Sequence, residues 1–573
     1  MERIVVDPIT RIEGHLRIEA DVQNGVIVDA LSSGSGFRGL EAVVENRDPR
    51  DIWAFVQRVC GVCTTTHALA SVRTVENALG IEIPKNANLI RNIMGAAQMM
   101  SDHLVHFYIL HALDWVDVVS GLKADPAETS RIAQAISKWP KSSVGYFTDV
   151  QNKIKALVES GQLGIFANGY WGHPSYKLPP EINLLATAHY LEALDFQREM
   201  VKVQTILGGK NPHPFYVVGG MATPLDPNND NSINIHRLMQ IERIIADGKT
   251  FIEQVYIPDL KAIGAAYAPT TNYGGGIENY LVMGSNPTKS INDVSSYRYP
   301  RGIIVDGDIN NVITDFDLTE KGEIAEFIDK SWYSYDGNKR TGGKHPLQGE
   351  TTPAYDGPAI PFKNLTVDQK YSWIKAPRWQ NKPMEVGPLA RMLVGYGLKK
   401  PEYVNIVDTT LAELGVGVGF LNSVLGRTVA RGLETVLAAG WGVQDMKDLI
   451  ANVKSGDLVT FNNTKWDPST WPKNAKGIGY MEGARGTLSH FIEIENGKSK
   501  KYQMIVPTTW NASPRNDDGV KAPYEAALTG APMVDIEQPL EILRVIHSFD
   551  PCIACAIHVA DTKNNKQIDI KIG

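Results

Sequence analysis

Two short stretches near opposite ends of the chain decide how it folds: residues 58–63, RVCGVC, and residues 550–555, DPCIAC. Between them they hold every cysteine of the 573-residue chain. The four are Cys60, Cys63, Cys552 and Cys555. The close spacing within each CxxC pair lets two sulfurs face one ion. Two such pairs predict a four-thiolate metal site at which both ends of the chain meet.

The cysteine pattern alone leaves the metal open. Four thiolates can hold structural zinc, an iron–sulfur cluster or nickel. A disulfide within each pair is a further alternative, although it would add little to so large a core. Zinc knuckles lie in small loop-rich modules, whereas these pairs are far apart in a chain with long helical patterns. The neighbours Arg58, Asp550 and His558 therefore favour a buried active site over a structural zinc.

Composition excludes several classes of protein. The chain is 43% hydrophobic and 21% charged, as is typical of a globular protein. Its net charge of −7 argues against a nucleic-acid binder, which would carry a basic stripe. We find no run of 18 apolar residues that would predict a membrane span. The first residues, MERIVVD, lack the pattern of a secretory signal.

Hydrophobic periodicity predicts an α+β fold that is predominantly helical. Helices are expected at 48–59, 86–113, 181–207, 233–266 with a break at Pro258, and at least two within 403–453, punctuated by Gly440 and Gly442. Asn-Gly turns predict strand hairpins near both ends, at 15–28 and 489–506. Residues 268–380 are rich in Gly, Pro, Asn and Asp, which indicates a peripheral region of short strands and loops.

We expect one large unit without an internal domain boundary, because the two halves of the metal site come from opposite ends. Its expected regions are N-terminal strands in 1–45, a helical core in 46–267 and 381–478, the peripheral region in 268–380, strands with the second cysteine pair in 479–558, and an extension in 559–573.

The two cysteine stretches, extended to 58–67 (RVCGVCTTTH) and 550–558 (DPCIACAIH), resemble the signatures of the nickel–iron hydrogenase large subunit. Four further stretches fit the same family: DPITRIEGH at 7–15, FRGLE at 37–41, EVGPLAR at 385–391 and PTTWN at 507–511. The ordered set covers nearly the whole chain and is specific, although each stretch alone is weak. The chain is most similar to the membrane-bound uptake branch.

The resemblance implies a role for each cysteine. Cys60 and Cys552 would be terminal ligands of nickel. Cys63 and Cys555 would bridge nickel to an iron that carries carbon monoxide and two cyanides. Hydrogen would be split heterolytically, with the Cys552 thiolate and the Glu13 carboxylate as first proton acceptors. Without the motif, a glutamate near Arg11 would read as a surface ion pair.

Four more residues take roles from the resemblance. Arg485 would lie above the metals, with Asp102 and Asp550 holding it and the Thr508 hydroxyl donating to a cyanide. Relatives carry proline before this arginine, whereas this chain has Ala484, which puts the rigidity of Arg485 in question. On spacing alone, Asp102 would be an acid on a helix surface.

A third metal, magnesium or a similar divalent cation, is also implied. Its expected ligands are Glu41, the His558 imidazole and a backbone carbonyl around Met504. Carboxylate, carbonyl and water suit Mg²⁺, although a histidine ligand is less typical. For His103 and His106 we expect core or hydrogen-bonding roles.

Electrons would leave through another chain, because no ferredoxin-type run of cysteines is present. The resemblance implies a small subunit with iron–sulfur clusters, then a cytochrome b and quinone at the periplasmic face of the cytoplasmic membrane. Export would use the twin-arginine signal of that small subunit. Nickel chaperones would load the site, and a maturation endopeptidase would then remove residues 559–573.

Three other functions are weighed against this one. A hydrogen sensor would have the same site with slow turnover, but the C-terminal extension favours the enzyme. The quinone-site subunit of respiratory NADH dehydrogenase is a relative that lacks the thiols. A zinc-stapled interaction protein is the remaining alternative.

Overall fold

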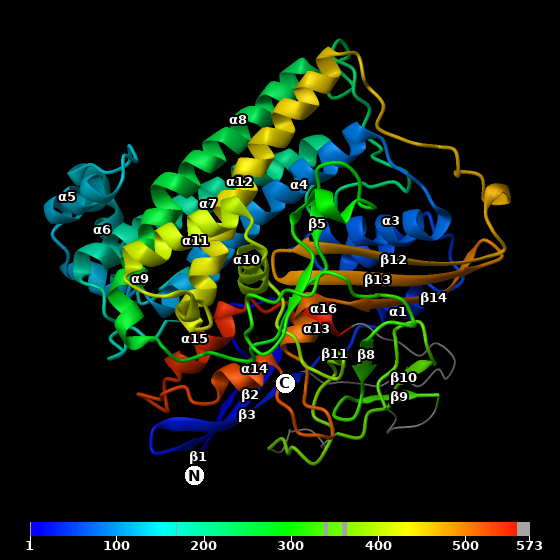
Figure 1. Ribbon diagram of the computed structural model, residues 1–573. Helices are drawn as coiled ribbons and strands as arrows, with labels where there is room; N and C mark the ends of the chain where they lie inside the picture. Colours follow the sequence, from blue (N-terminus) through cyan, green and yellow to red (C-terminus); the bar gives the residue numbers. More distant parts are fainter. Residues whose placement is uncertain (1, 168, 337–341, 358–363, 558–573) are drawn as a thin grey trace.

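The computed structural model describes residues 2–557 except 168, 337–341 and 358–363 (Figure 1). His558 and the extension at 559–573 lie outside the described residues, so the predictions made for them stay predictions.

Four long helices form the centre of the molecule and lie side by side (Figure 1). They are α4 (Lys85–Leu104), α7 (Pro180–Gly208), α8 (Ile235–Phe251) and α12 (Val424–Lys454). Helix α12 packs against α4 and α8, and α4 packs against α7. The predicted apolar face of α4, which includes Leu89, Ile90 and Ile93, is buried. The predicted helical core is confirmed.

One predicted helix boundary is wrong. Helix α12 runs through Gly440 and Gly442, and the break lies earlier, where Gly415 caps α11 (Pro401–Leu414) with φ +68°. A Cβ at Gly442 would lie 3.1 Å from the Cβ of Ala96 on α4. This glycine therefore allows two helices to approach each other, which a sequence pattern does not distinguish from a stop signal.

Two predicted helices contain π-helical segments. The first continues from α4 into Val105–His111. The second passes from α8 through Ile252–Tyr256 to α9 (Ile257–Tyr267), so its irregularity lies just before Pro258. Because Pro258 has no N–H to donate, it removes one hydrogen bond of the continuous helix at this irregular turn.

Several helices were not predicted from the sequence. The longer ones are α3 (Thr66–Leu79), α5 (Pro126–Ile136) and α6 (Val144–Glu159). The shorter ones are α1 (Leu40–Val43), α10 (Pro388–Gly397), α13 (Pro507–Asn511), α14 (Pro523–Leu528), α15 (Leu540–Ser548) and α16 (Ile553–Ala556). Helix α2 (Ile52–Val56) and a 3₁₀ turn (Gln57–Val59) occupy the predicted helix before the first cysteine pair.

Both predicted hairpins are present, each as part of an antiparallel three-stranded sheet. The N-terminal sheet is β1 (Glu2–Val6), β2 (Leu16–Gln23) and β3 (Val26–Gly34). The C-terminal sheet is β12 (Asn474–Gly483), β13 (Gly486–Glu495) and β14 (Lys498–Ile505). Asn and Gly have positive φ at both turns, as a two-residue hairpin loop requires.

The peripheral region also matches its prediction. Its short strands pair in twos, and the strands labelled in Figure 1 lie on either side of the C-terminal sheet. They are β4 (Tyr280–Val282), β5 (Ser285–Pro287), β6 (Tyr297–Tyr299), β7 (Gly302–Ile304), β8 (Ile324–Phe327), β9 (Tyr333–Tyr335), β10 (Thr351–Pro353) and β11 (Ala376–Trp379). The α+β, mostly helical class is confirmed.

Helix α3 lies flat on β12, and two glycines make this contact possible. A Cβ at Gly479 would lie 2.3 Å from the Thr74 nitrogen and 2.4 Å from the Ala70 oxygen. Gly477 meets the same helix one turn further along. Because α3 begins just after Cys63, this contact fixes the position of the first cysteine pair.

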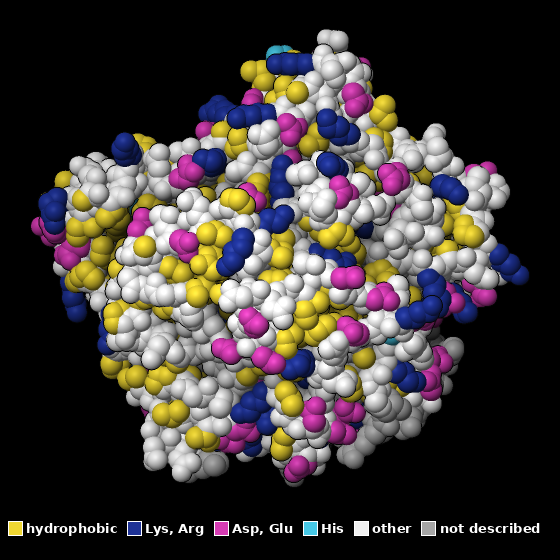
Figure 2. Space-filling view, in the orientation of Figure 1, with side chains coloured by type: hydrophobic (Ala, Val, Ile, Leu, Met, Phe, Trp, Pro, Cys, Tyr) yellow, Lys and Arg dark blue, Asp and Glu magenta, His cyan; other side chains and the backbone are white. Residues whose placement is uncertain are grey.

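The surface agrees with the mild negative charge. On the face shown in Figure 2, basic and acidic side chains are interspersed and neither forms a continuous stripe. Among the described residues, no helix has the length and apolar character needed to span a membrane.

We expect Gly479→Ala to destabilise the protein by about 1–3 kcal/mol, because the added methyl group would meet the backbone of α3, which cannot move aside. Thermal unfolding of the purified protein measures the effect. Gly440→Ala is the matched control, since nothing lies within 4 Å of its Cβ position in a helix interior. It should leave Tm unchanged or raise it slightly. Equal Tm values for the two variants would contradict the close α3–β12 contact.

Candidate metal centre

The four cysteines meet at one buried point, as predicted. Their ligand atoms all lie within 4.8 Å of one another, and all four are free thiols. The Sγ–Sγ distances are 3.5 Å for Cys60–Cys552 and 3.8 Å for Cys63–Cys555. The disulfide alternative therefore does not describe this structure.

Short helices at each pair set these positions. The 3₁₀ turn after α2 ends at Val59, directly before Cys60, and the carbonyl of Cys63 accepts a hydrogen bond from Thr66 N at the start of α3. Helix α15 leads to the second pair, where Asp550 turns the chain with φ +58°. Arg38 joins the two pairs by donating to the carbonyls of Val59 and Ala554.

The metal-free thiols cannot all ionise. Hydrogen bonds from the other thiols, chiefly Cys552, hold the pKa of Cys60 well below its usual range. Burial raises the pKa of Cys552 and Cys555 well above theirs. Four thiolates at this spacing need bound cations to offset their charge, and soft thiolates suit nickel and iron. The donor set therefore fits a nickel–iron centre.

Glu13 reaches the centre across the close contact between the two chain ends. Its Oε2 lies 3.2 Å from Cys552 Sγ and accepts from Ala554 N at 3.0 Å. Burial, then the charge of Cys60, raises its pKa. Gly14 makes the approach possible: its φ is +81°, and a Cβ there would lie 2.6 Å from the Ala554 nitrogen. Glu13 is therefore not a surface ion pair.

Arg485 lies beside the cysteines and is held by Asp550. It donates from Nε to the Asp550 carbonyl at 3.1 Å and from Nη2 to Asp550 Oδ1 at 3.0 Å. Its buried Nη1 has no hydrogen-bond acceptor within the described part of the chain, although Asp102 Oδ2 lies 3.7 Å away. A buried donor of this kind fits an additional acceptor at the metals. The charge of Arg485 also favours thiolates at Cys552 and Cys63.

Asp102 and Thr508 also lie at this site. Asp102 is 4% exposed, so the alternative of a helix-surface acid is wrong. Burial raises its pKa to about 7 despite the opposing charge of Arg485. Thr508 Oγ1 accepts from Cys552 N at 3.1 Å, which leaves the hydroxyl proton to be donated elsewhere.

Arg431, which was not predicted from the sequence, also contacts this site: its Nη1 lies 3.5 Å from Asp550 Oδ2. Arg431 is fully buried on α12 and faces His103, which in turn bonds to Glu434 at 2.8 Å. An arginine in a long helix carries no local signal for such a role. The expectation that His103 and His106 form core hydrogen bonds is confirmed, since His106 bonds to the His547 carbonyl.

Glu41 and Met504 come together at a second site. Glu41, in the short helix α1, is 2% exposed and accepts from Met504 N at 2.6 Å. Burial raises its pKa to about 8, although Lys375 opposes the shift. Lys375 bonds at 2.6 Å to a second buried carboxylate, Glu326. A hard cation would offset the charge of this pair of acids. The expected ligand His558 lies outside the described residues.

A third cluster joins His111, Asp114 and His547, whose ligand atoms also lie within 4.8 Å. Hydrogen bonds from both histidines to Asp114 hold this cluster together.

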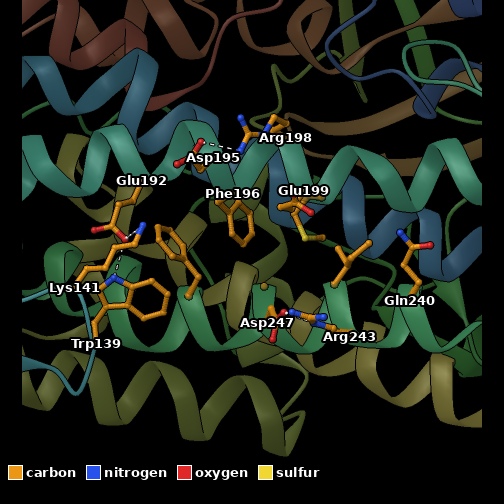
Figure 3. Close-up of a pocket in the computed structure, with 14 residues that line it drawn as sticks. Trp139, Lys141, Glu192, Asp195, Phe196, Arg198, Glu199, Gln240, Arg243 and Asp247 are labelled. Atoms are coloured by element: carbon orange, nitrogen blue, oxygen red, sulfur yellow. Dashed lines mark hydrogen bonds and ion pairs between the residues drawn. The ribbon is translucent and has the colours of Figure 1, made fainter. Parts of the chain in front are cut away.

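The groove drawn in Figure 3 lies between α7 and α8 and shares no residue with the cysteine site. Phe196 and other apolar side chains line it, and charged pairs such as Arg243 and Asp247 stand at its edge. Glu192 accepts from the Trp139 ring nitrogen at 2.8 Å. None of the residues predicted to bind metal or take part in catalysis lines this groove.

Comparison with known proteins gives one consistent family. The model described as nickel-dependent hydrogenase matches residues 38–558, and one described as HoxL-like matches residues 3–30. The chain is 51% identical to the uptake hydrogenase large subunit of Rhizobium leguminosarum bv. viciae and 48% identical to the hydrogenase-1 large chain of Escherichia coli K12. Each alignment covers 100% of this chain and 97% of the relative.

Solved structures agree. A variant of the nickel–iron–selenium hydrogenase of Desulfovibrio vulgaris Hildenborough superposes with a TM-score of 0.77 at 30% identity, over 97% of this chain and 99% of that one. With the four-cysteine site in place, the chain belongs to the nickel-dependent hydrogenases, as a catalytic large subunit of the uptake type.

Proposed function

We propose that this subunit oxidises H₂ at a nickel–iron centre held by the four cysteines, and that Glu13 carries the proton away. One observation supports this most strongly: a partly buried carboxylate lies 3.2 Å from the sulfur of Cys552 within a cluster of four free thiols. A structural zinc site would need neither this carboxylate nor a buried arginine beside it.

The division among the cysteines follows the family resemblance. Cys60 and Cys552 would bind nickel alone, while Cys63 and Cys555 would bridge it to an iron with carbon monoxide and two cyanide ligands. When bound, the centre supplies the heterolytic splitting of hydrogen. The remaining chemistry falls to groups of the chain itself.

Glu13 is placed to accept the proton. Its Oε2 faces Cys552 Sγ, so a proton on that sulfur can pass directly to the carboxylate. Burial raises the pKa of Glu13, which makes its carboxylate a better proton acceptor. The Ala554 N–H holds the same oxygen in place.

Arg485 and Thr508 would hold the non-protein ligands of iron. The Asp550 bonds fix the guanidinium and leave Nη1 as a donor. The Thr508 oxygen accepts from Cys552 N, so its hydroxyl proton can be donated to another group. Fixed donors of this kind stabilise charge without reorganisation. Because Asp550 binds Arg485 at two atoms, Ala484 in place of proline does not leave the side chain free.

A large subunit of this type works with a small subunit, which we propose docks over the loop of the first cysteine pair. Cys60 and Cys63 are buried, but Gly61 and Val62 between them are exposed. Phe215, 49% exposed, lies beside Trp53 and extends an apolar surface. An iron–sulfur cluster brought there would lie close to the thiolates. Electrons would continue to a cytochrome b and quinone at the periplasmic face of the membrane.

A divalent cation, most simply Mg²⁺, would bind at Glu41 with His558 and the Met504 carbonyl. The buried acids Glu41 and Glu326 beside one lysine support this. Removal of residues 559–573 by an endopeptidase after loading by nickel chaperones stays a prediction.

Metal analysis tests the centre directly. In the heterodimer purified without oxygen, we expect about one nickel and one iron per large subunit, after allowing for the iron of the small subunit. Infrared bands of carbon monoxide and cyanide should accompany them. Zinc alone, without such bands in a fully processed subunit, would refute the proposed centre.

Two variants test the position of Glu13. Glu13→Gln should lower kcat by about 10²–10⁴-fold, because the proton acceptor is lost. Gly14→Ala should lower kcat by about tenfold or more, because its Cβ would push the loop away from Ala554. Gly161→Ala is the matched control: φ is also positive at +69°, but nothing lies within 4 Å. Hydrogen-dependent dye reduction measures all three, and loss of activity in the control would contradict the steric explanation.

The cation site predicts a pH dependence. Below pH 8, Mg²⁺ must displace a proton from Glu41, whose pKa is about 8 in the metal-free protein. The apparent affinity should therefore rise about tenfold per pH unit up to pH 8 and then level off. Calorimetric titration of chelator-treated protein checks the slope. Glu41→Gln should abolish binding, whereas Glu159→Gln, at an exposed position, should not. A pH-independent affinity would contradict Glu41 as a ligand.

A further inference from the structure

A buried cluster of charges joins three segments of the chain close to the metal centre. His547 is on α15, Asp114 follows the π-helical segment after α4, and Arg11 is in the N-terminal loop. The side chains of His547 and Asp114 are fully buried and that of Arg11 is 9% exposed. None of these residues has a role in the mechanism described above.

The hydrogen bonds fix the protonation of His547. Its Nδ1 lies 2.6 Å from Asp114 Oδ2, and its Nε2 lies 2.8 Å from the Thr10 carbonyl oxygen. Both partners are acceptors, so both ring nitrogens must carry hydrogen. His547 is therefore an imidazolium with a carboxylate counter-ion.

The neighbouring bonds are consistent with this assignment. The Trp115 ring N–H donates to His111 Nε2, so His111 carries its hydrogen on Nδ1 and donates to Asp114 Oδ2 at 3.0 Å. Arg11 donates to Asp114 Oδ1 at 2.6 Å. Although burial opposes it, the charges of Arg11 and His547 hold the pKa of Asp114 well below its usual range. With three donors on one carboxylate, the cluster does not need a metal.

The two bonds of His547 connect the chain ends that build the site. Thr10 is three residues before Glu13, and His547 is five residues before Cys552. At the other end of this short stretch, Ile553 N donates to the Glu13 carbonyl at 2.9 Å. The loop that carries Glu13 is thus bonded to the C-terminal segment at Thr10 and again at Glu13.

We propose that His547 is a positioning residue: as an imidazolium bound to Asp114, it holds the Thr10 carbonyl and thereby places the Glu13 carboxylate against Cys552. This inference rests on the proposed role of Glu13. Without the bond to Thr10, the loop keeps its backbone bonds to Pro551 and Ile553 and the bonds that Arg11 donates to Asp114 and Leu110. The backbone before Arg11 is then no longer held to α15, so the Glu13 carboxylate can shift. A misplacement of about 1 Å is enough to lower a rate about 10²-fold.

His547→Gln tests the proposal in the complete heterodimer. Glutamine has no charge, and its single amide nitrogen cannot donate to both Asp114 and the Thr10 carbonyl, which lie at opposite sides of the native imidazole ring. His189→Gln is the matched control. His189, on α7, is also buried, and its Nδ1 lies 2.8 Å from a carboxylate oxygen of Asp259. Both variants should lower Tm and keep their nickel content. Only His547→Gln should lower kcat, by about 10- to 100-fold, with the KM for H₂ unchanged and a larger solvent isotope effect.

A double-mutant cycle with Glu13→Gln gives a sharper result. If His547 acts through Glu13, adding His547→Gln to Glu13→Gln should cause no further loss of kcat. Additive losses with intact nickel would overturn the proposal. A crystal structure of the His547→Gln heterodimer decides independently of catalysis: displacement of Glu13 from Cys552 supports the proposal, and an unmoved carboxylate overturns it. If Glu13→Gln alone stays fully active, the proposed function of Glu13 is wrong. The crystal structure of the His547→Gln heterodimer would still show whether His547 positions the Glu13 carboxylate.

Discussion

Charge repulsion among four buried sulfurs is the constraint on which the rest of the structure depends. The thiols lie within 4.8 Å of one another, where burial and mutual repulsion prevent more than partial ionisation without cations. Metal ligation requires thiolates, so the surroundings must supply positive charge and fixed donors before and after loading. Arg485 supplies the charge, and its own position is set by Asp550 in the same turn as the second cysteine pair.

Because the two pairs come from opposite ends of the chain, the fold must bring backbone against backbone. Gly14 passes so close to Ala554 that no side chain fits between them, and Gly479 does the same for the helix that follows Cys63. Arg38 then bonds to carbonyls of both cysteine loops. These contacts join segments that are far apart in the sequence and involve only atoms of the polypeptide, so the polypeptide itself shapes the site. The long helices provide the rigid frame for this arrangement.

The sequence predicted what depends on short-range patterns. Periodicity located the long helices, and Asn-Gly turns located both hairpins, because these signals are written in neighbouring residues. The meeting of the cysteines followed from their number and spacing, and the roles of Glu13 and Arg485 came from resemblance. Gly440 and Gly442 were misread as breaks, because a glycine that allows two helices to approach, as Gly442 does, cannot be told from a helix stop by sequence alone. The role of Arg431 could not be predicted, because its partner Asp550 is far away in the sequence.

His547 shows the same limit more sharply. In the sequence it is a histidine five residues before a cysteine, and its protonation is undetermined. Only the fold places an acceptor at each ring nitrogen and so fixes its charge. H₂ has no charge and no hydrogen-bonding group by which a protein could orient it. The rate must then depend on where the protein holds its own groups. This is the reason we give for a buried cluster of Arg11, Asp114 and His547 that positions the Glu13 carboxylate. The open groove between α7 and α8 contains no cysteine and none of these groups.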